Sequence, residues 1–229
     1  TLFPYTTLFR SDGPDDDTLL NRALLYLNQQ GEYKENDLYT PALCHRLDTG
    51  TSGLVLLAKN NAAEAFLTEA IKKREIEKRY LCVTFGRPNP PAALLRDYLL
   101  KDAERGIVRI TDTTAGGAKE VITGYETLAV SGRLALLEVE LVTGRTHQIR
   151  AHLAYLGHPV LGDIKYGNRK MNERTGLKTQ ALCAQRLTFG RIPEENTLHY
   201  LSGRVIKLDD PAIVKKFDAL TKTDRKSVV

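Results

Sequence analysis

The chain has 229 residues, of which 42% are hydrophobic and 27% charged, and its formal net charge is +5. That size suits a domain with a sizeable core. No segment reaches the roughly 18 apolar residues of a membrane span, and no secretory signal is visible. Three cysteines without CxxC spacing argue against a disulfide framework or a zinc site and favour a reducing cytoplasm.

The two ends of the chain fit no adjoining pattern. Residues 1–11 and 224–229 resemble translated read-through of sequencing adapters. We therefore expect both to be non-native tails and exclude them from fold reasoning. Residues 12–223 are expected to form one domain whose native N-terminal segment is missing.

The first half of the chain predicts two helices separated by a turn and a strand. Asp17 is a candidate cap for a helix over 18–28. A polar loop over 30–41 precedes a turn rich in Gly, Thr and Ser, and the apolar run 54–58 then predicts a buried strand. An amphipathic stripe predicts a second helix from Asn60 to about residue 74.

The second half is richer in strands, and its predicted elements follow one another without regular alternation of strand and helix. Strands are expected at 79–86, 108–111, 119–128, 134–142 and 181–187. Helices are expected at 146–156 and 211–220, a proline-rich turn at 88–91 and a flexible polar stretch at 168–178. This arrangement predicts an α+β fold whose central sheet is mixed, largely antiparallel, and flanked by helices and loops.

Asp48 stands beside Arg46 in the Gly- and Thr-rich turn, directly before the predicted buried strand. Catalytic groups are often mounted at such positions on a rigid scaffold. An aspartate in a turn also commonly caps the turn with its own side chain. Spacing alone leaves both interpretations open.

Arg145 and Arg150 lie on different sides of the helix predicted after residue 145. Five residues correspond to a rotation that leaves them roughly 140° apart, so one arginine can point inward. A buried arginine needs an anionic partner, and Asp48 is a candidate; the alternative is that Arg150 lies at the surface. The segments 72–79 and 145–152 are locally basic, which suits a polyanion or a solvated helix end.

The sequence lacks the motifs of several other kinds of functional site. His147 and His152 are five residues apart and no HExxH is present, which argues against a metal site. No P-loop or GxGxxG is present, so no nucleotide cofactor is expected. Ser52 does not lie in a GxSxG elbow, which argues against an esterase.

Three segments carry a resemblance to a known family. They are HRLDTGTSGLVLLAKN at 45–60, EKRYLCVTFGRP at 77–88 and LLEVELVTGRTHQIRAHLAYLGHPVLGDIKYG at 136–167. Together, in this order, they resemble the RluA family of pseudouridine synthases, and the likeness runs from about residue 18 to residue 190. The segments 99–102 and 116–119 are similar to the branch that modifies large-subunit ribosomal RNA.

This resemblance implies the pseudouridine synthase fold and the isomerisation of uridine in RNA to its C-glycoside, without cofactor or metal. It implies Asp48 as the catalytic carboxylate, either adding to the sugar or removing a sugar proton. Tyr80 would stack on the uracil and help to remove the C5 proton. Arg150 would pair with the aspartate. The expected substrate is 23S ribosomal RNA, with transfer RNA as the alternative, and the protein is expected to be a monomer without a membrane partner.

The resemblance also implies an RNA-binding set. Arg46 would fill the gap left by a flipped nucleotide, since the target atoms are inaccessible inside a stacked helix. Arg145, His147 and Lys78 are candidates for phosphate contacts. The family's N-terminal strand with a Lys-Pro motif is not found here, nor is an S4 domain. Two alternatives stay open, which are a catalytically impaired RNA-binding module and a small hydrolase that uses Asp48 with His45.

Overall fold

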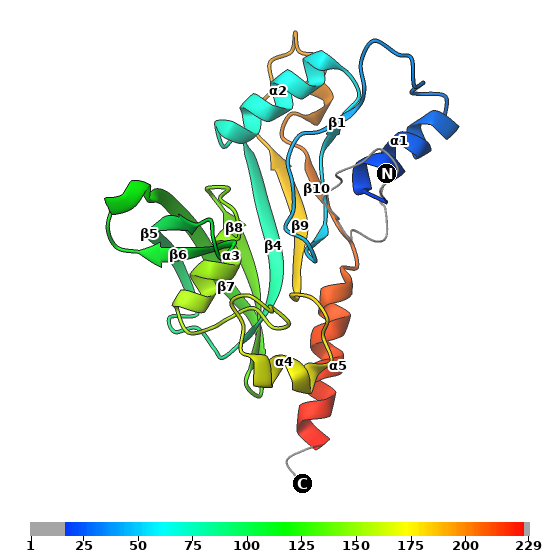
Figure 1. Ribbon diagram of the computed structural model, residues 1–229. Coiled ribbons are helices and arrows are strands. Elements are labelled where there is room, and N and C mark those ends of the chain that lie inside the picture. Colours follow the sequence, from blue (N-terminus) through cyan, green and yellow to red (C-terminus); the bar gives the residue numbers. More distant parts are fainter. Residues whose placement is uncertain (1–16, 227–229) are drawn as a thin grey trace.

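The computed structural model describes residues 17–226, with side chains described to residue 221, as a mixed sheet with helices on both faces (Figure 1). The helices are α1 (Leu19–Gln29), α2 (Asn61–Lys72), α3 (Gln148–Tyr155), α4 (Arg169–Thr175) and α5 (Ala212–Lys226). The strands are β1 (Ala42–Leu43), β2 (Ser52–Gly53), β3 (Leu57–Ala58), β4 (Ile76–Phe85), β5 (Ala92–Asp102), β6 (Ile107–Thr111), β7 (Lys119–Ser131), β8 (Leu134–Leu141), β9 (Leu182–Phe189) and β10 (Val205–Lys207).

The large sheet has eight strands in the order β10-β9-β4-β8-β7-β5-β6, and β2 also pairs with β9. Its pairings are antiparallel except for that between β2 and β9, which is parallel. β1 and β3 form a separate two-stranded sheet. The predicted α+β fold with a mixed, largely antiparallel sheet is therefore confirmed.

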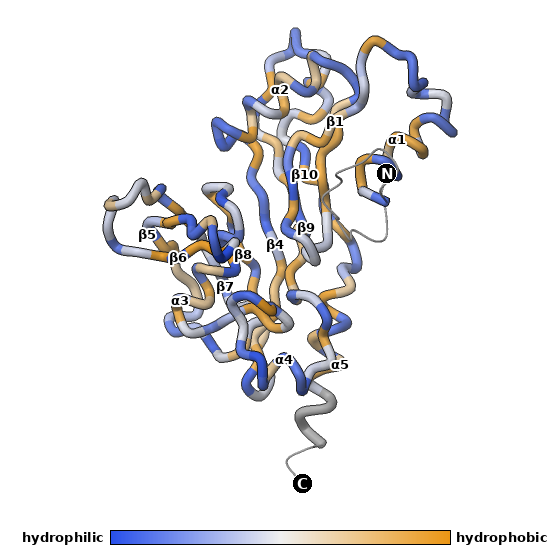
Figure 2. Tube along the Cα trace, in the orientation of Figure 1, coloured by the Kyte–Doolittle hydropathy of each residue, from blue (hydrophilic) through white to orange (hydrophobic). Residues whose placement is uncertain are grey.

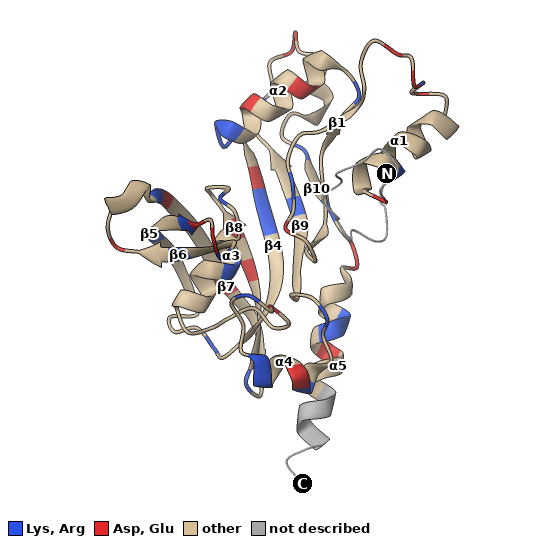
Figure 3. Cartoon of the chain, viewed as in Figure 1, with Lys and Arg blue, Asp and Glu red and all other residues tan. Residues whose placement is uncertain are grey.

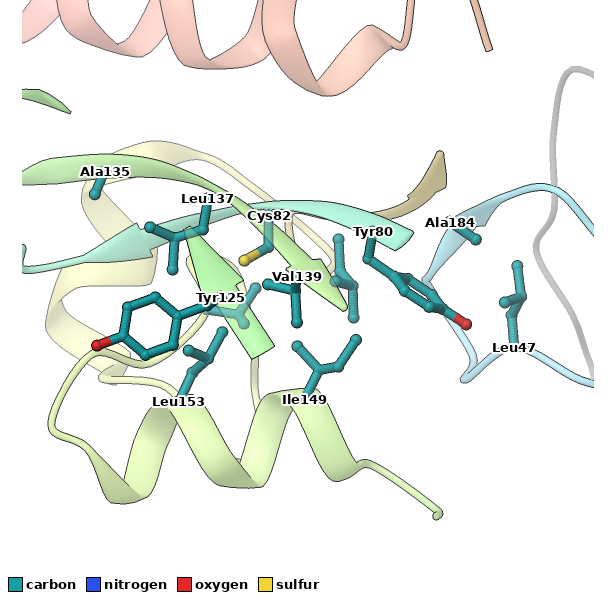
Figure 4. Packing of buried hydrophobic residues seen from close by; sticks show 12 residues of the cluster. Leu47, Tyr80, Cys82, Tyr125, Ala135, Leu137, Val139, Ile149, Leu153 and Ala184 are labelled. Carbon is teal, nitrogen blue, oxygen red and sulfur yellow. The ribbon is translucent and has the colours of Figure 1, made fainter. Parts of the chain in front are cut away.

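Strand β4 is buried on both sides, which places it at the centre of the molecule. Tyr80 and Cys82 face a core that includes Ile149 and Leu153 of α3. The intervening residues, such as Leu81, face a second core with α5. Figure 4 shows α3 on one side of β4 and β8 and a C-terminal helix on the other. The period-2 alternation of side chains thus gives each face of the sheet its own helix.

The two N-terminal helices form largely where the sequence predicts them. α2 begins after Asn60, whose side chain accepts a hydrogen bond from the Ala63 amide, and it buries one apolar stripe. α1 is capped by Thr18 and not by Asp17, which instead forms an ion pair with Arg22. Figure 2 shows hydrophilic and hydrophobic segments along both helices, as expected of helices with one buried face.

The structure differs from the sequence-based expectation at three places. The apolar run 54–58 is not one strand, because β2 pairs with β9 and β3 pairs with β1, with the residues between them outside either strand. β5 was not predicted, and it pairs with both β6 and β7. The stretch expected to be flexible contains α4, which Asn168 caps.

In the described part of the chain, no helix is long and apolar enough to cross a membrane. The expected tail at 1–11 lies outside the described residues. Of the expected tail at 224–229, only the backbone of residues 224–226 is described, as the end of α5.

Candidate functional site

A pocket of about 430 Å³ lies between the turn that carries Asp48, strand β4 and the start of α3. All seven residues singled out from the sequence line it, namely Arg46, Asp48, Lys78, Tyr80, Arg145, His147 and Arg150. The fold therefore brings together residues from three distant segments. The volume lies within the roughly 300–1,000 Å³ of pockets for small ligands, so it suits a single nucleotide better than a helical segment.

The turn that carries Asp48 is held against β9. Gly53 has a φ of +120°, and a Cβ there would lie 2.2 Å from the carbonyl oxygen of Ala184, so only glycine fits this close approach. Gln180 donates hydrogen bonds to the Thr49 carbonyl at 2.7 Å and to Thr51 Oγ1 at 3.0 Å. These contacts fix the turn to the central sheet, which positions the Asp48 carboxylate.

Arg150 is the positive partner of Asp48, as the sequence suggested, but it has a second and closer partner. Its Nη1 donates to Asp48 Oδ2 at 3.2 Å. Its Nε and Nη2 donate to the two carboxylate oxygens of Asp163 at 2.6 and 3.0 Å. The Arg150 side chain is 4% exposed and that of Asp163 is 0% exposed, against 20% for Asp48. Arg150 is thus oriented by a buried bidentate pair, and its remaining donor reaches Asp48 at the pocket.

The buried pair shifts the ionisation of both partners. Burial by itself would raise the pKa of Asp163, but the hydrogen bonds and charge of Arg150 hold it below its ordinary value. Burial by itself would lower the pKa of Arg150, and its two carboxylate partners instead raise it. The loop amides of Lys165 and Tyr166 also donate to Asp163 Oδ1, at 2.8 and 3.0 Å. Asp163 is therefore an anion whose lone pairs are well satisfied.

Tyr80 lies at the edge of the core beside the Asp48 turn. Figure 4 shows its hydroxyl directed toward Leu47, the residue before Asp48. Burial, with a contribution from the charge of Asp48, raises the pKa of Tyr80 above its ordinary value, so it is a neutral phenol. At this point β4 pairs Arg79 with Arg186 but Tyr80 with Ala184, which leaves one extra residue on β9. Such bulges are common next to active sites, where they re-aim a side chain.

The loop before α3 is held by a fully paired glutamine. Gln148 is 2% exposed. Its Oε1 accepts from Thr143 Oγ1 at 2.8 Å and from the Arg145 amide at 3.1 Å, and its Nε2 donates to the Ile122 carbonyl and to Thr123 Oγ1. His147 precedes it with a φ of 54°, in the left-handed region that non-glycine residues seldom adopt. The network fixes the backbone on which Arg145 and His147 are presented.

The pocket lining is strongly cationic. Arg46 and Arg145 are exposed, and Lys72 and Arg74 at the end of α2 also line the pocket. Lys78 is partly buried on β4, and burial lowers its pKa. Among the residues that line the pocket in the described part of the chain, Asp48 is the single carboxylate, against six arginines and lysines. An anionic ligand is what this balance favours.

His45 supports the turn that carries Asp48. Its Nε2 accepts a hydrogen bond from the Leu56 amide at 3.1 Å. Burial, with the charge of Lys78, lowers the pKa of His45 to about 4, so the ring is neutral near pH 7. Because its Nε2 already accepts a hydrogen bond from the backbone, His45 is poorly placed to act as a general base together with Asp48. This weighs against the hydrolase alternative.

Sequence reasoning did not single out Asp163 and Tyr166, although both lie in the third motif. The signal available was indirect: an inward arginine needs an anionic partner, and the GDIKYG segment offers one. Within the described residues, no group of three or more His, Cys, Asp and Glu side chains is arranged to hold a metal ion.

The amino-acid sequence matches known proteins over this region. A family model described as RNA pseudouridylate synthase matches residues 12–155. The ribosomal large subunit pseudouridine synthase C of Rickettsia typhi is 40% identical over 154 residues, which cover 66% of this chain and 48% of that protein. The chloroplastic RNA pseudouridine synthase 2 of Oryza sativa subsp. japonica is 37% identical over 180 residues, covering 77% and 38%. The chain thus spans about half the length, or less, of these curated relatives.

The fold also matches solved structures. The human RNA pseudouridylate synthase domain containing 4 superposes with a TM-score of 0.71 at 22% identity, covering 94% of this chain and 87% of that one. The human RNA pseudouridylate synthase domain containing 1 gives a TM-score of 0.62 at 24% identity, covering 81% and 73%. These likenesses establish the architecture. With the family match over more than half of its residues, the chain belongs to the RNA pseudouridylate synthase family.

Proposed function

We propose that this protein is a site-specific RNA pseudouridine synthase whose substrate is 23S ribosomal RNA. The observation that carries the proposal is the pocket in which Asp48, the single carboxylate among the described residues of the lining, faces Arg150 and is surrounded by cationic side chains. Membership of the family supports the reaction, and the name of the Rickettsia typhi relative supports the ribosomal substrate. The three free thiols suit a reducing cytoplasm.

The reaction breaks the bond between C1′ and N1, turns the uracil, and joins C5 to C1′. N1 gains a proton and C5 loses one, so the isomerisation is balanced without a redox partner. In this proposal Asp48 either adds to C1′ or removes a sugar proton, and Arg150 supplies the compensating positive charge in both cases. Because the Tyr80 phenol is neutral, it serves first as a stacking face and can accept the C5 proton only after losing its own.

The cationic lining is proposed to bind the RNA backbone. Arg145 on the loop before α3 and Lys78 on β4 both line the pocket, and Lys78 Nζ lies close to Gly144, the residue before Arg145. His147 stands beside Arg145 on the same loop. Phosphate contacts of this kind position RNA without reading its sequence. Arg46, exposed next to Asp48, is proposed to occupy the space left by the flipped uridine.

The direct test is to map new pseudouridines in RNA after incubation with the protein, by carbodiimide modification and primer extension. The wild-type chain is expected to produce a stop in unmodified 23S ribosomal RNA, and transfer RNA is run in parallel. A stop in transfer RNA alone replaces the ribosomal substrate with the alternative. The absence of any stop, with RNA binding retained, would instead indicate a binding module.

The matched variant is Asp48→Asn, which keeps the shape of the side chain and removes its charge. Turnover is expected to fall by at least about 10³-fold, because either chemical role of Asp48 needs the carboxylate. RNA binding should persist. The control is Asp112→Asn, the same change at an exposed position after β6, which should leave turnover unchanged. Retained turnover in Asp48→Asn would reject Asp48 as the catalytic group.

A further inference from the structure

Tyr166 connects the buried ion pair, the pocket and the β5–β6 hairpin. Its ring lies under the Arg150 guanidinium, with Cζ 5.3 Å from the ring centroid. Its amide donates to Asp163. Its hydroxyl oxygen lies 2.9 Å from His147 Nδ1 and 2.8 Å from the amide nitrogen of Val108 on β6. One side chain is thus in contact with Arg150, which pairs with Asp48, and with His147 at the pocket.

The hydrogen atoms around the Tyr166 hydroxyl can be assigned. The Val108 amide can only donate, so the phenolic oxygen accepts there. Among the described residues, His147 Nδ1 is then the one acceptor within reach of the hydroxyl proton. Burial raises the pKa of Tyr166 and keeps that proton in place. Tyr166 therefore donates to Nδ1, and a neutral imidazole with an unprotonated Nδ1 carries its hydrogen on Nε2.

The second ring nitrogen of His147 remains available at the pocket. His147 lines the pocket, and among the described residues its Nε2 has no hydrogen-bond partner. The charged groups that face the ring are Asp48, Arg150, Lys165 and Asp163. Burial, with Arg150 and Lys165, lowers the pKa of His147 against the opposing effect of the two carboxylates. With a hydrogen on Nδ1, the Tyr166 hydroxyl proton would be left without an acceptor among the described residues.

We infer that Tyr166 is a positioning residue that holds His147 as the neutral Nε2–H tautomer, so that His147 offers one hydrogen-bond donor to an oxygen atom of the target nucleotide. The tautomer follows from the contacts of the Tyr166 hydroxyl and from the burial that keeps its proton in place. The identity of the acceptor as a nucleotide oxygen rests on the proposed function.

The tautomer is measured by long-range ¹H–¹⁵N correlation spectra of the full chain labelled at histidine. The wild-type His147 signals are expected to show a protonated Nε2 and an unprotonated Nδ1. In Tyr166→Phe the ring remains under Arg150, but Nδ1 loses its donor. The spectra should then show both tautomers, and the pKa of His147 should rise by about one unit. Its protonation would give the pH–turnover profile a new acid limb.

The matched control is Tyr155→Phe, which removes a hydroxyl from an exposed tyrosine on α3. It should leave the signals of His147 unchanged. A second control, Tyr125→Phe, removes a hydroxyl that donates to the Pro90 carbonyl away from the pocket. It shows how far the loss of a hydroxyl contact elsewhere in the molecule changes the tautomer and the pKa of His147. A wild-type spectrum with the hydrogen on Nδ1 overturns the assignment, whether or not Tyr166→Phe folds. An unchanged tautomer and pKa in a folded Tyr166→Phe overturn the positioning role.

The acceptor is identified by titrating the labelled wild-type protein with uridine 5′-monophosphate and, separately, with inorganic phosphate. If the His147 Nε2–H signal shifts with the nucleotide but not with inorganic phosphate, the acceptor is a base or sugar oxygen. If it shifts in both titrations, the acceptor is a phosphate oxygen. No shift with either overturns the contact with the nucleotide. None of these readings depends on turnover, so a failure of the pseudouridine assay and a failure of this inference are separately visible.

Discussion

Arg150 and Arg79 are both surrounded by carboxylates, yet they lie in very different environments. Arg79 contacts Glu77, Glu138 and Glu140 on strands β4 and β8, and its side chain is 27% exposed. Figure 3 shows acidic and basic segments following one another along β4. Arg150 has two carboxylate partners and is 4% exposed. By the number of ion pairs, the Arg79 cluster is the larger one.

The difference shows that burial and access to a pocket, and not the number of partners, distinguish the cluster at the candidate site from the one nearer the surface. Charges in the Arg79 cluster are partly hydrated, so each pair contributes little. In the Arg150 cluster, removing Arg150 and Asp163 from water costs free energy. That cost is offset only because the hydrogen bonds between the two side chains have good geometry. One partner, Asp48, is left at the pocket with a single hydrogen bond from Arg150, where a substrate can reach it.

The largest expected effect comes from Asp163→Asn. Asparagine keeps an oxygen for the loop amides but removes the charge, and it can place an amide group against the Arg150 donors. We expect the free energy of unfolding to fall by about 3–5 kcal/mol, because an arginine is left buried without its main partner. Urea denaturation followed by circular dichroism measures the loss.

The matched substitution in the other cluster is Glu138→Gln, at the carboxylate shared by Arg79 and Arg186. It should cost about 1 kcal/mol or less, because the cluster is partly exposed. Equal losses in the two variants would contradict the distinction drawn between the clusters.

The sequence predicted which side chains line the pocket better than it predicted the contacts that hold them in place. Asp48, Tyr80 and Arg150 stand one in each of the three motifs that carry the family resemblance, and all three line the pocket. Asp163 was missed because its pairing with Arg150 is a tertiary contact that spacing does not encode. β5 was missed because residues 92–102 hold no β-branched side chain, and pairing with β6 and β7 overrides that local preference.

Acid should destabilise the Arg150 cluster through Asp163. Its pKa in the folded protein lies below the unfolded value, so the stabilisation is fully present above about pH 4 and is lost as the pH falls through the folded pKa. The loss amounts to about 1.4 kcal/mol for each unit by which the pKa is lowered. In Asp163→Asn the free energy of unfolding should therefore depend less on pH below 4. An acid limb as steep as that of the wild type would assign the effect to other carboxylates.

The smallest expected effect is that of salt on the stability of the two variants, and it distinguishes the Arg150 cluster from the Arg79 cluster most directly. Raising NaCl from about 0.05 to 1 M shortens the Debye length severalfold, which screens exposed charges far more than buried ones. The destabilisation caused by Glu138→Gln should therefore shrink by up to about 1 kcal/mol, whereas that caused by Asp163→Asn should change little. Urea denaturation of both variants and the wild type at the two salt concentrations measures this difference. If both losses shrank alike, the Arg150 cluster would be as accessible to solvent as the Arg79 cluster, and its burial could not be what holds Arg150 toward Asp48.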